Sequence, residues 1–359
     1  MPEKSLLSVL FIAGMLGASL AALPLMQAHV SASKMTDNNI SIEEYDKMKN
    51  CTTDLDKRPT SIEYLTHFNC GRVSTTEDGQ TIREFTLIVE ENQTVPVSHE
   101  GHTLNAWTFN GTVPGPTMRM TEGDLVRITV INSEDSVHPH SLHMHSIHEA
   151  AMDGVQSDPI APGDSFTYEF IAQPYGVYPY HCHIDPIADH INRGLYGILI
   201  IDPKEPRPQM TELAMMMNSY DLDYDLEGPV TIPTVQELES GNRTEEEERG
   251  NEIYTVNGKA FDYMHYPIEL EVGKDYRIYV VNMVEFDLVN SFHVHGALFE
   301  YYPSGTSDKP AFTNDIIVLG QGDRGIMEMS YKYPGKYMFH AHVSEFTDLG
   351  WMGFFNVTG

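Results

Sequence analysis

The chain has 359 residues, of which 41% are hydrophobic, and its formal net charge is −30. A charge of this size argues against binding to nucleic acid or anionic lipid, and it favours attraction of cations, including metal ions or a basic electron donor. Solubility or adaptation to salt would explain the same charge. The length suits two domains of ordinary size.

The N-terminus has the pattern of an export signal. Lys4 precedes an uncharged stretch in which Leu6–Met26 is strongly apolar, and Val30-Ser-Ala32 is a candidate cleavage site. Because the apolar run nearly spans a bilayer, an uncleaved anchor is the alternative. We expect residues 1–33 to be a signal peptide or membrane anchor. The rest of the chain would then be extracellular, at the cell surface or in a periplasm-like space.

Residues 34–80 form a polar N-terminal extension. Cys51 and Cys70 lie in it and could pair in an oxidising compartment, which would order this segment.

The remaining chain alternates short strand-like segments with turns rich in Gly, Pro, Asn and Asp. Alternating residues predict strands at 84–90, 125–131, 196–201 and 276–281, and no long helix is expected to carry a motif. This pattern is typical of all-β sandwiches or barrels. A Pro-rich linker at 202–208 divides the chain into domain 1 at 81–203 and domain 2 at 204–359.

Histidines are paired along the chain in a way that suits β-strands. Residues i and i+2 of a strand face one side and residue i+1 faces the other, so each His-x-His pair could aim two imidazoles at one metal. The four pairs are His143 and His145, His181 and His183 (which enclose Cys182), His293 and His295, and His340 and His342. The other histidines outside the cysteine motif are expected to be ordinary surface or turn residues: His29, His67, His99, His102, His138, His148 and His265.

Cys182 with two imidazoles favours copper over zinc, in the trigonal ligand set of type 1 copper. His140 lies an odd number of residues before His143 and would therefore face the side to which Cys182 points. A loop could return His190, eight residues after Cys182, as the second imidazole. Leu195 stands where such sites often carry an axial Met. Because Leu cannot ligate, we expect a three-coordinate copper of raised potential.

The His-x-His pairs belong to an internal repeat. In both halves a Gly precedes an Asn by nine residues, and that Asn precedes the first His by eleven. In the second half, Asn290, Ala341 and Phe346 stand at or near the type 1 positions. Domain 1 would therefore carry both kinds of site, and domain 2 only half of a cluster. The repeated landmarks are Asn110-Gly111, Gly123, Asn132 and His143, then Asn257-Gly258, Gly273, Asn282 and His293.

These motifs, together with the run 106–116, resemble multicopper oxidases, specifically two-domain, laccase-like members related to copper nitrite reductases. The resemblance covers residues 84–359. It implies two cupredoxin-like Greek-key β-barrels in tandem and four coppers per chain, one of type 1, one of type 2 and a binuclear type 3 pair. Oxidation of a reductant would then be coupled to reduction of dioxygen to water.

By the same resemblance the paired histidines hold a trinuclear copper cluster. His143 and His293 would hold type 2 copper, and Asp153 is similar to a carboxylate that orients the water on that copper. A turn-forming Asp-Gly is the simpler role for Asp153. The type 3 ligands would be His145, His181, His183, His295, His340 and His342.

Two other functions fit parts of the pattern. A copper nitrite reductase uses the same barrels, but in that group the position of His143 is an Asp and that of His183 is not a ligand. A non-catalytic cupredoxin that relays electrons or stores copper would not need the three pairs that lack a Cys. We therefore expect an oxidase; its reductant could be a phenol, a metal ion or a redox protein.

Each half carries only two His-x-His pairs, so a trinuclear cluster needs two halves face to face. The resemblance implies that domain 1 of one subunit meets domain 2 of the next in a closed ring of three. We expect a homotrimer with the trinuclear sites at subunit interfaces, and no nucleic-acid partner.

Overall fold

The computed structural model describes residues 51–52, 54, 57–155, 159–222 and 250–359. The expected signal or anchor at 1–33 and the extension up to residue 50 lie outside the described residues. Within the described ranges, no helix has the length and hydrophobicity needed to cross a membrane.

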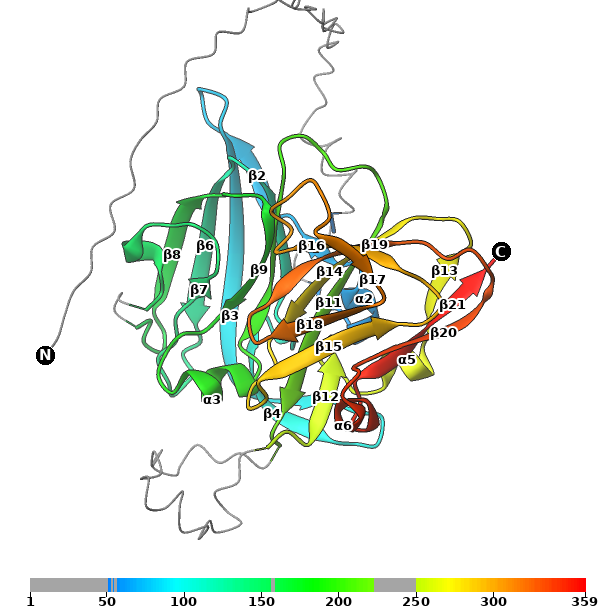
Figure 1. Cartoon of the computed structure of the whole chain (residues 1–359). Helices are drawn as coiled ribbons and strands as arrows, with labels where there is room; N and C mark the ends of the chain where they lie inside the picture. Colours follow the sequence, from blue (N-terminus) through cyan, green and yellow to red (C-terminus); the bar gives the residue numbers. More distant parts are fainter. Residues whose placement is uncertain (1–50, 53, 55–56, 156–158, 223–249) are drawn as a thin grey trace, which may run out of the picture. The chain divides into compact units, whose positions relative to one another are not determined.

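The first half of the described chain is a sandwich of two sheets (Figure 1). Its strands are β1 (Phe68–Asn69), β2 (Arg72–Thr75), β3 (Thr81–Pro96), β4 (Thr103–Phe109), β5 (Thr117–Thr121), β6 (Leu125–Asn132), β7 (His143–Met144), β8 (Ser165–Ile171), β9 (Gly176–His181) and β10 (Tyr196–Asp202). One sheet has the order β2-β3-β6-β8 with β4 beside β3, and the other has the order β1-β5-β10-β9-β7. Apolar residues of both sheets form one core.

The second half repeats this plan. Its strands are β11 (Thr211–Tyr220), β12 (Ile253–Val256), β13 (Ile268–Glu271), β14 (Tyr276–Asn282), β15 (Val289–Val294), β16 (Phe299–Pro303), β17 (Phe312–Asn314), β18 (Ile316–Gly320), β19 (Arg324–Met329), β20 (Gly335–His340) and β21 (Met352–Thr358). The sheet orders are β12-β11-β14-β19-β16-β17 and β13-β21-β20-β15-β18. Strands β3, β6 and β8 pair as β11, β14 and β19 do, first parallel and then antiparallel.

The internal repeat is also visible in the backbone. Asn110 and Asn257 both adopt left-handed conformations, with φ of 58° and 53°, and each precedes a Gly with positive φ. Asn132 and Asn282 are both buried and donate their side-chain amides to nearby carbonyls. The four predicted strand segments lie within β3, β6, β10 and β14, which confirms the all-β expectation.

Helices are few and short in the described ranges. They are α2 (Ser61–Tyr64), the 3₁₀ turn η1 (Ala150–Met152), α3 (Ile187–Asn192), α5 (Asp262–His265) and α6 (Ser344–Asp348). Helix α3 carries His190, so a short helix supplies this imidazole where we expected a loop.

Each half has its own apolar core, and a third apolar cluster joins the two halves. It contains Tyr196 and Ile198 from β10 together with Met216 from β11 and Tyr279 from β14. Strand β10 is therefore buried along its whole length, because one face packs on its own core and the other on the second half.

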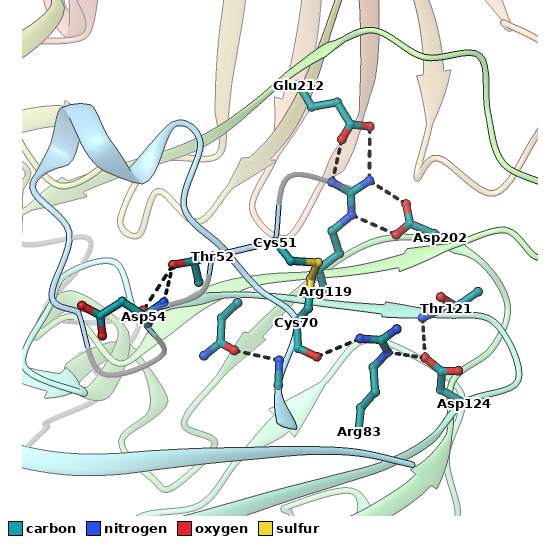
Figure 2. Close-up of a disulfide and its surroundings, with 12 residues drawn as sticks. Cys51, Thr52, Asp54, Cys70, Arg83, Arg119, Thr121, Asp124, Asp202 and Glu212 are labelled. Atoms are coloured by element: carbon teal, nitrogen blue, oxygen red, sulfur yellow. Dashed lines mark hydrogen bonds and ion pairs between the residues drawn. A yellow bond between two sulfur atoms is a disulfide. The ribbon is translucent and has the colours of Figure 1, made fainter. Parts of the chain in front are cut away.

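Buried charges cross the same junction (Figure 2). Arg119 on β5 makes two hydrogen bonds to Asp202, of 2.8 and 2.9 Å, and two to Glu212 on β11, of 2.6 and 3.2 Å. Arg277 on β14 donates to the same Glu212 at 3.0 Å. Such charges are tolerated in a protein interior because they are paired and hydrogen-bonded.

The N-terminal segment is tied to the first half. Cys51 and Cys70 form a disulfide, and Arg83 donates a hydrogen bond of 2.9 Å to the Cys70 carbonyl (Figure 2). Strand β1, just before Cys70, pairs in parallel with β5. Part of the extension at 34–80 is thus built into the sheets of the first half.

Replacing Arg119 with Met should destabilise the protein by about 3–5 kcal/mol, because Asp202 and Glu212 would lose a buried partner. The control is Arg127→Met, since Arg127 pairs with Glu169 at 2.7 Å on the surface, where such pairs contribute little to stability. Urea denaturation followed by fluorescence measures both. Equal losses in the two variants would contradict the role given to Arg119.

Candidate metal centres

Cys182 and two histidines meet in the core of the first half. The ligand atoms of His140, Cys182 and His190 lie within 4.8 Å of one another, and Cys182 Sγ is 3.7 Å from His140 Nδ1. His140 and Cys182 are fully buried, and His190 is 3% exposed. The fold thus brings together the three residues predicted for a type 1 site.

The donor atoms of this trio fit copper. The Nδ1 atom of His190 is buried without a hydrogen-bond partner, and Cys182 is free. Burial lowers the pKa of His190 to about 3, so its imidazole is neutral, and raises the pKa of the Cys182 thiol to about 11. Metal binding would therefore displace a thiol proton. One sulfur and two nitrogen donors in a dry site are the set that copper uses for electron transfer.

Leu195 lies in the same core cluster as Cys182. It is fully buried, and its carbonyl accepts a hydrogen bond of 3.0 Å from the Cys182 amide. Its side chain offers no donor atom, so the absence of an axial ligand from this position remains our prediction.

Four histidines form a second group in the first half. The ring centroid of His143 lies 5.1 to 5.3 Å from those of His145, His181 and His183. His145 Nε2 is 3.2 Å from His181 Nε2. His181 Nδ1 lies 2.9 Å from the Cys182 carbonyl, so a proton on Nδ1 leaves Nε2 free for a metal. Burial lowers the pKa of His145 to about 3 and of His181 to about 4, which keeps both rings neutral.

The second half holds a matching group. The ring centroid of His293 lies 5.0, 5.3 and 5.4 Å from those of His295, His340 and His342. His295 Nε2 is 3.1 Å from His340 Nε2, and His340 Nδ1 is 2.6 Å from the Ala341 carbonyl. All eight paired histidines therefore lie in two groups of equivalent geometry.

In each group one aspartate lies beside the Nδ1 atom of the first histidine. His143 Nδ1 is 2.8 Å from the Asp153 carbonyl and 3.2 Å from its Oδ1. His293 Nδ1 is 2.8 Å from the Asp315 carbonyl and 4.0 Å from its Oδ2. Sequence reasoning missed Asp315, because Asp153 follows His145 by eight residues whereas Asp315 follows His295 by twenty.

His148 is more enclosed than the ordinary surface or turn residue that we expected. Its side chain is 7% exposed, and its Nε2 lies 3.8 Å from Asp153 Oδ1 and 2.9 Å from the Met144 carbonyl. It shares a possible metal-binding group with His143 and Asp153, although the backbone already engages its ring.

The second half has packed side chains where the first half has the cysteine trio. The Ala341 amide donates to the Trp351 carbonyl as the Cys182 amide donates to the Leu195 carbonyl. Trp351 and Phe346 are buried in the core of this half. The buried residues that stand in for the three ligands are Asn290, Ala341 and Phe346.

The two histidine groups stay separate within one chain. In the part of the chain that the structure describes, no cluster of potential ligand atoms contains histidines from both halves. His293, His295 and Asp315 line a surface cavity with Leu298.

Comparison with known proteins agrees with this arrangement. Residues 91–206 and 227–359 match two sequence families described as multicopper oxidase. A crystal structure of a multicopper oxidase is 42% identical to the chain, with a TM-score of 0.73 over 83% of this chain and 97% of that one. The blue copper oxidase of Nitrosomonas europaea is 28% identical, with a TM-score of 0.64 over 77% of this chain and 86% of that one.

Nitrite reductases are also similar. The copper-containing nitrite reductase of Neisseria gonorrhoeae is 29% identical over 248 residues, which are 68% of this chain and 60% of that protein's length. The chain thus spans less than two thirds of that relative. The duplicated sandwiches are the cupredoxin-like barrels expected from the sequence, and the chain belongs to the multicopper oxidase family, a family of copper oxidoreductases.

Proposed function

We propose that the protein couples four one-electron oxidations of a reductant at a type 1 copper to reduction of dioxygen to water at a trinuclear copper cluster. One observation carries this proposal: Cys182 belongs to the buried trio, while its neighbours His181 and His183 belong to the outer histidine group. A few covalent bonds would thus connect the two centres. Bound copper would supply the redox chemistry, taking up single electrons at one centre and binding dioxygen at the other.

The chain's own residues hold and orient these metals. His140, Cys182 and His190 would bind type 1 copper. Asp153 and Asp315 would fix the ring orientation of the type 2 ligands through their Nδ1 atoms. The trinuclear ligands would be His143 and His293 for type 2 copper, with His145, His181, His183, His295, His340 and His342 for the type 3 pair.

A copper-containing nitrite reductase is the second candidate, because such enzymes are among the similar proteins. Against it stand His143 and His183, the two positions at which the family resemblance distinguishes the oxidases from the nitrite reductases. Both are histidines, and their ring centroids are 5.1 Å apart in one cluster. This complete set supports the oxidase.

Copper-loaded protein should contain four coppers per chain by elemental analysis and should consume dioxygen with an aromatic diamine. Cys182→Ser should lose the blue absorption and one copper, because the thiolate is the ligand that defines type 1 copper. Two coppers per chain, with nitrite consumed and no dioxygen uptake, would instead identify a nitrite reductase.

We further propose a homotrimer in which domain 1 of one subunit meets domain 2 of the next. The separate histidine groups support it, and so do exposed apolar side chains beside both. Ile147 and Val155 are 59% and 44% exposed next to the first group, and Leu298 and Val318 are 62% and 66% exposed next to the second. Large apolar side chains that gather on a surface are typical of protein–protein interaction sites.

His143→Ala and His293→Ala should each abolish dioxygen reduction while leaving the blue absorption at Cys182 nearly intact. Co-expression of the two variants should restore part of the activity, because a mixed trimer pairs one intact domain 1 with an intact domain 2. Activity assays and analytical ultracentrifugation measure this. A fully active monomer, or no recovery in mixed trimers, would refute the shared site.

Leu195→Met should lower the potential of the type 1 centre, because a thioether near the copper can act as an axial ligand and stabilise the oxidised metal. Spectroelectrochemistry at the blue band measures the change. Leu199→Met, in the same core cluster, is the control and should leave the potential unchanged. A potential in the wild type already equal to that of Leu195→Met would argue against an absent axial ligand.

We also propose that the protein acts outside the reducing cytosol, with residues 1–33 as signal or anchor. The Cys51–Cys70 disulfide supports this location, since such bonds persist in oxidising compartments.

A further inference from the structure

Both imidazoles of the cysteine trio are closed off from solvent. His140 is fully buried and His190 is 3% exposed, so a reductant in solution has almost no direct access to either ring. Electrons must therefore reach the trio through other side chains. One such route begins at His138, a histidine to which the sequence motifs assign no role.

Glu91 connects His138 to His140. The carboxylate of Glu91, whose side chain is 1% exposed, lies 2.9 Å from His140 Nε2 and 3.0 Å from His138 Nδ1. It also accepts hydrogen bonds from the amides of His138 and Val137, at 2.9 and 3.2 Å. The carboxylate thus bridges the two rings.

Trp107 makes a second connection. Its ring centroid lies 4.6 Å from that of His138, 5.3 Å from that of His140 and 4.8 Å from that of His190. Trp107 is itself 3% exposed. One aromatic ring thus contacts both buried imidazoles and His138.

His138 is the exposed end of both connections. Its side chain is 45% exposed, and neighbouring Val137 is 69% exposed. Glu134 and Asp135, in the same loop between β6 and β7, are exposed carboxylates without a cationic partner in the described part of the chain. Such a loop attracts positively charged molecules.

We propose that His138 is the site at which a cationic one-electron donor delivers electrons to the type 1 centre, through the Glu91 hydrogen bonds and the Trp107 ring. In each step the donor would lose one electron and bound type 1 copper would take it up; no bond would break and no proton would be required. This proposal rests on the type 1 copper proposed above.

The test is anaerobic stopped-flow reduction of the copper-loaded full chain by hexaammineruthenium(II), followed at the blue band. His138→Ala should slow the second-order reduction on the order of tenfold, because losing the contact route lengthens the approach of the donor. The blue absorption, the type 1 potential and reoxidation by dioxygen should not change. The control variant His102→Ala removes another exposed histidine, and its copper should be reduced at the wild-type rate.

Two further measurements refine the result. His138→Phe keeps a ring beside Trp107 and the backbone hydrogen bond to Glu91 but loses the imidazole contact with Glu91. Wild-type rates would therefore assign the route to Trp107, and slow rates would assign it to the contact between the imidazole and Glu91. The double variant Glu134→Gln with Asp135→Asn should slow reduction by hexaammineruthenium(II), which is a cation attracted by the two carboxylates. It should not slow reduction by ferrocyanide, which is an anion.

An unchanged rate in His138→Ala, or a loss fully explained by a shifted potential, would overturn the proposal. Absence of blue copper in the wild type would instead overturn the proposed function.

Discussion

The alternation of side chains along an extended backbone is the constraint on which both centres depend. At the end of β9, Cys182 points into the apolar core while His181 and His183 lie in the outer histidine group. Adjacent residues thus reach a dry site and a more open one without any loop between them. A shift of register by one residue would exchange the two faces and destroy both sites together.

The second half shows that the residues on the inner side of the strands can differ while the histidines on the outer side stay the same. Histidines on the outer side are retained at β15 and β20, where they lie near the surface. Inside, Ala341, Phe346 and Trp351 are ordinary core residues of a well-packed sandwich. An unmetallated buried imidazole is costly unless it is hydrogen-bonded, whereas apolar packing is favourable. Core residues at the inner positions therefore give a well-packed interior without disturbing the outer pairs.

The junction between the halves also bears on function. The apolar layer around Tyr196 and Met216, with the charges of Arg119 and Glu212, ties β10 to the second half. Strand β10 pairs with β9, which leads into Cys182, so interdomain packing supports the backbone of the cysteine trio. The proposed connection from the trio to solvent lies elsewhere, at His138 and the loop after β6.

Strand periodicity and a fixed repeat determined most of this protein from the sequence alone: the all-β fold, the two halves, the histidine pairs and the trio around Cys182. These features are local, because they follow from spacing along one strand or between repeated landmarks. The contacts of Asp315, His148, Glu91 and His138 with the histidine groups and the trio were decided only by the tertiary structure. More residues separate Asp315 from its histidine pair than separate Asp153 from its own pair, and Glu91 is 49 residues from His140. Contacts of that kind depend on how sheets and loops pack together, and no local spacing encodes them.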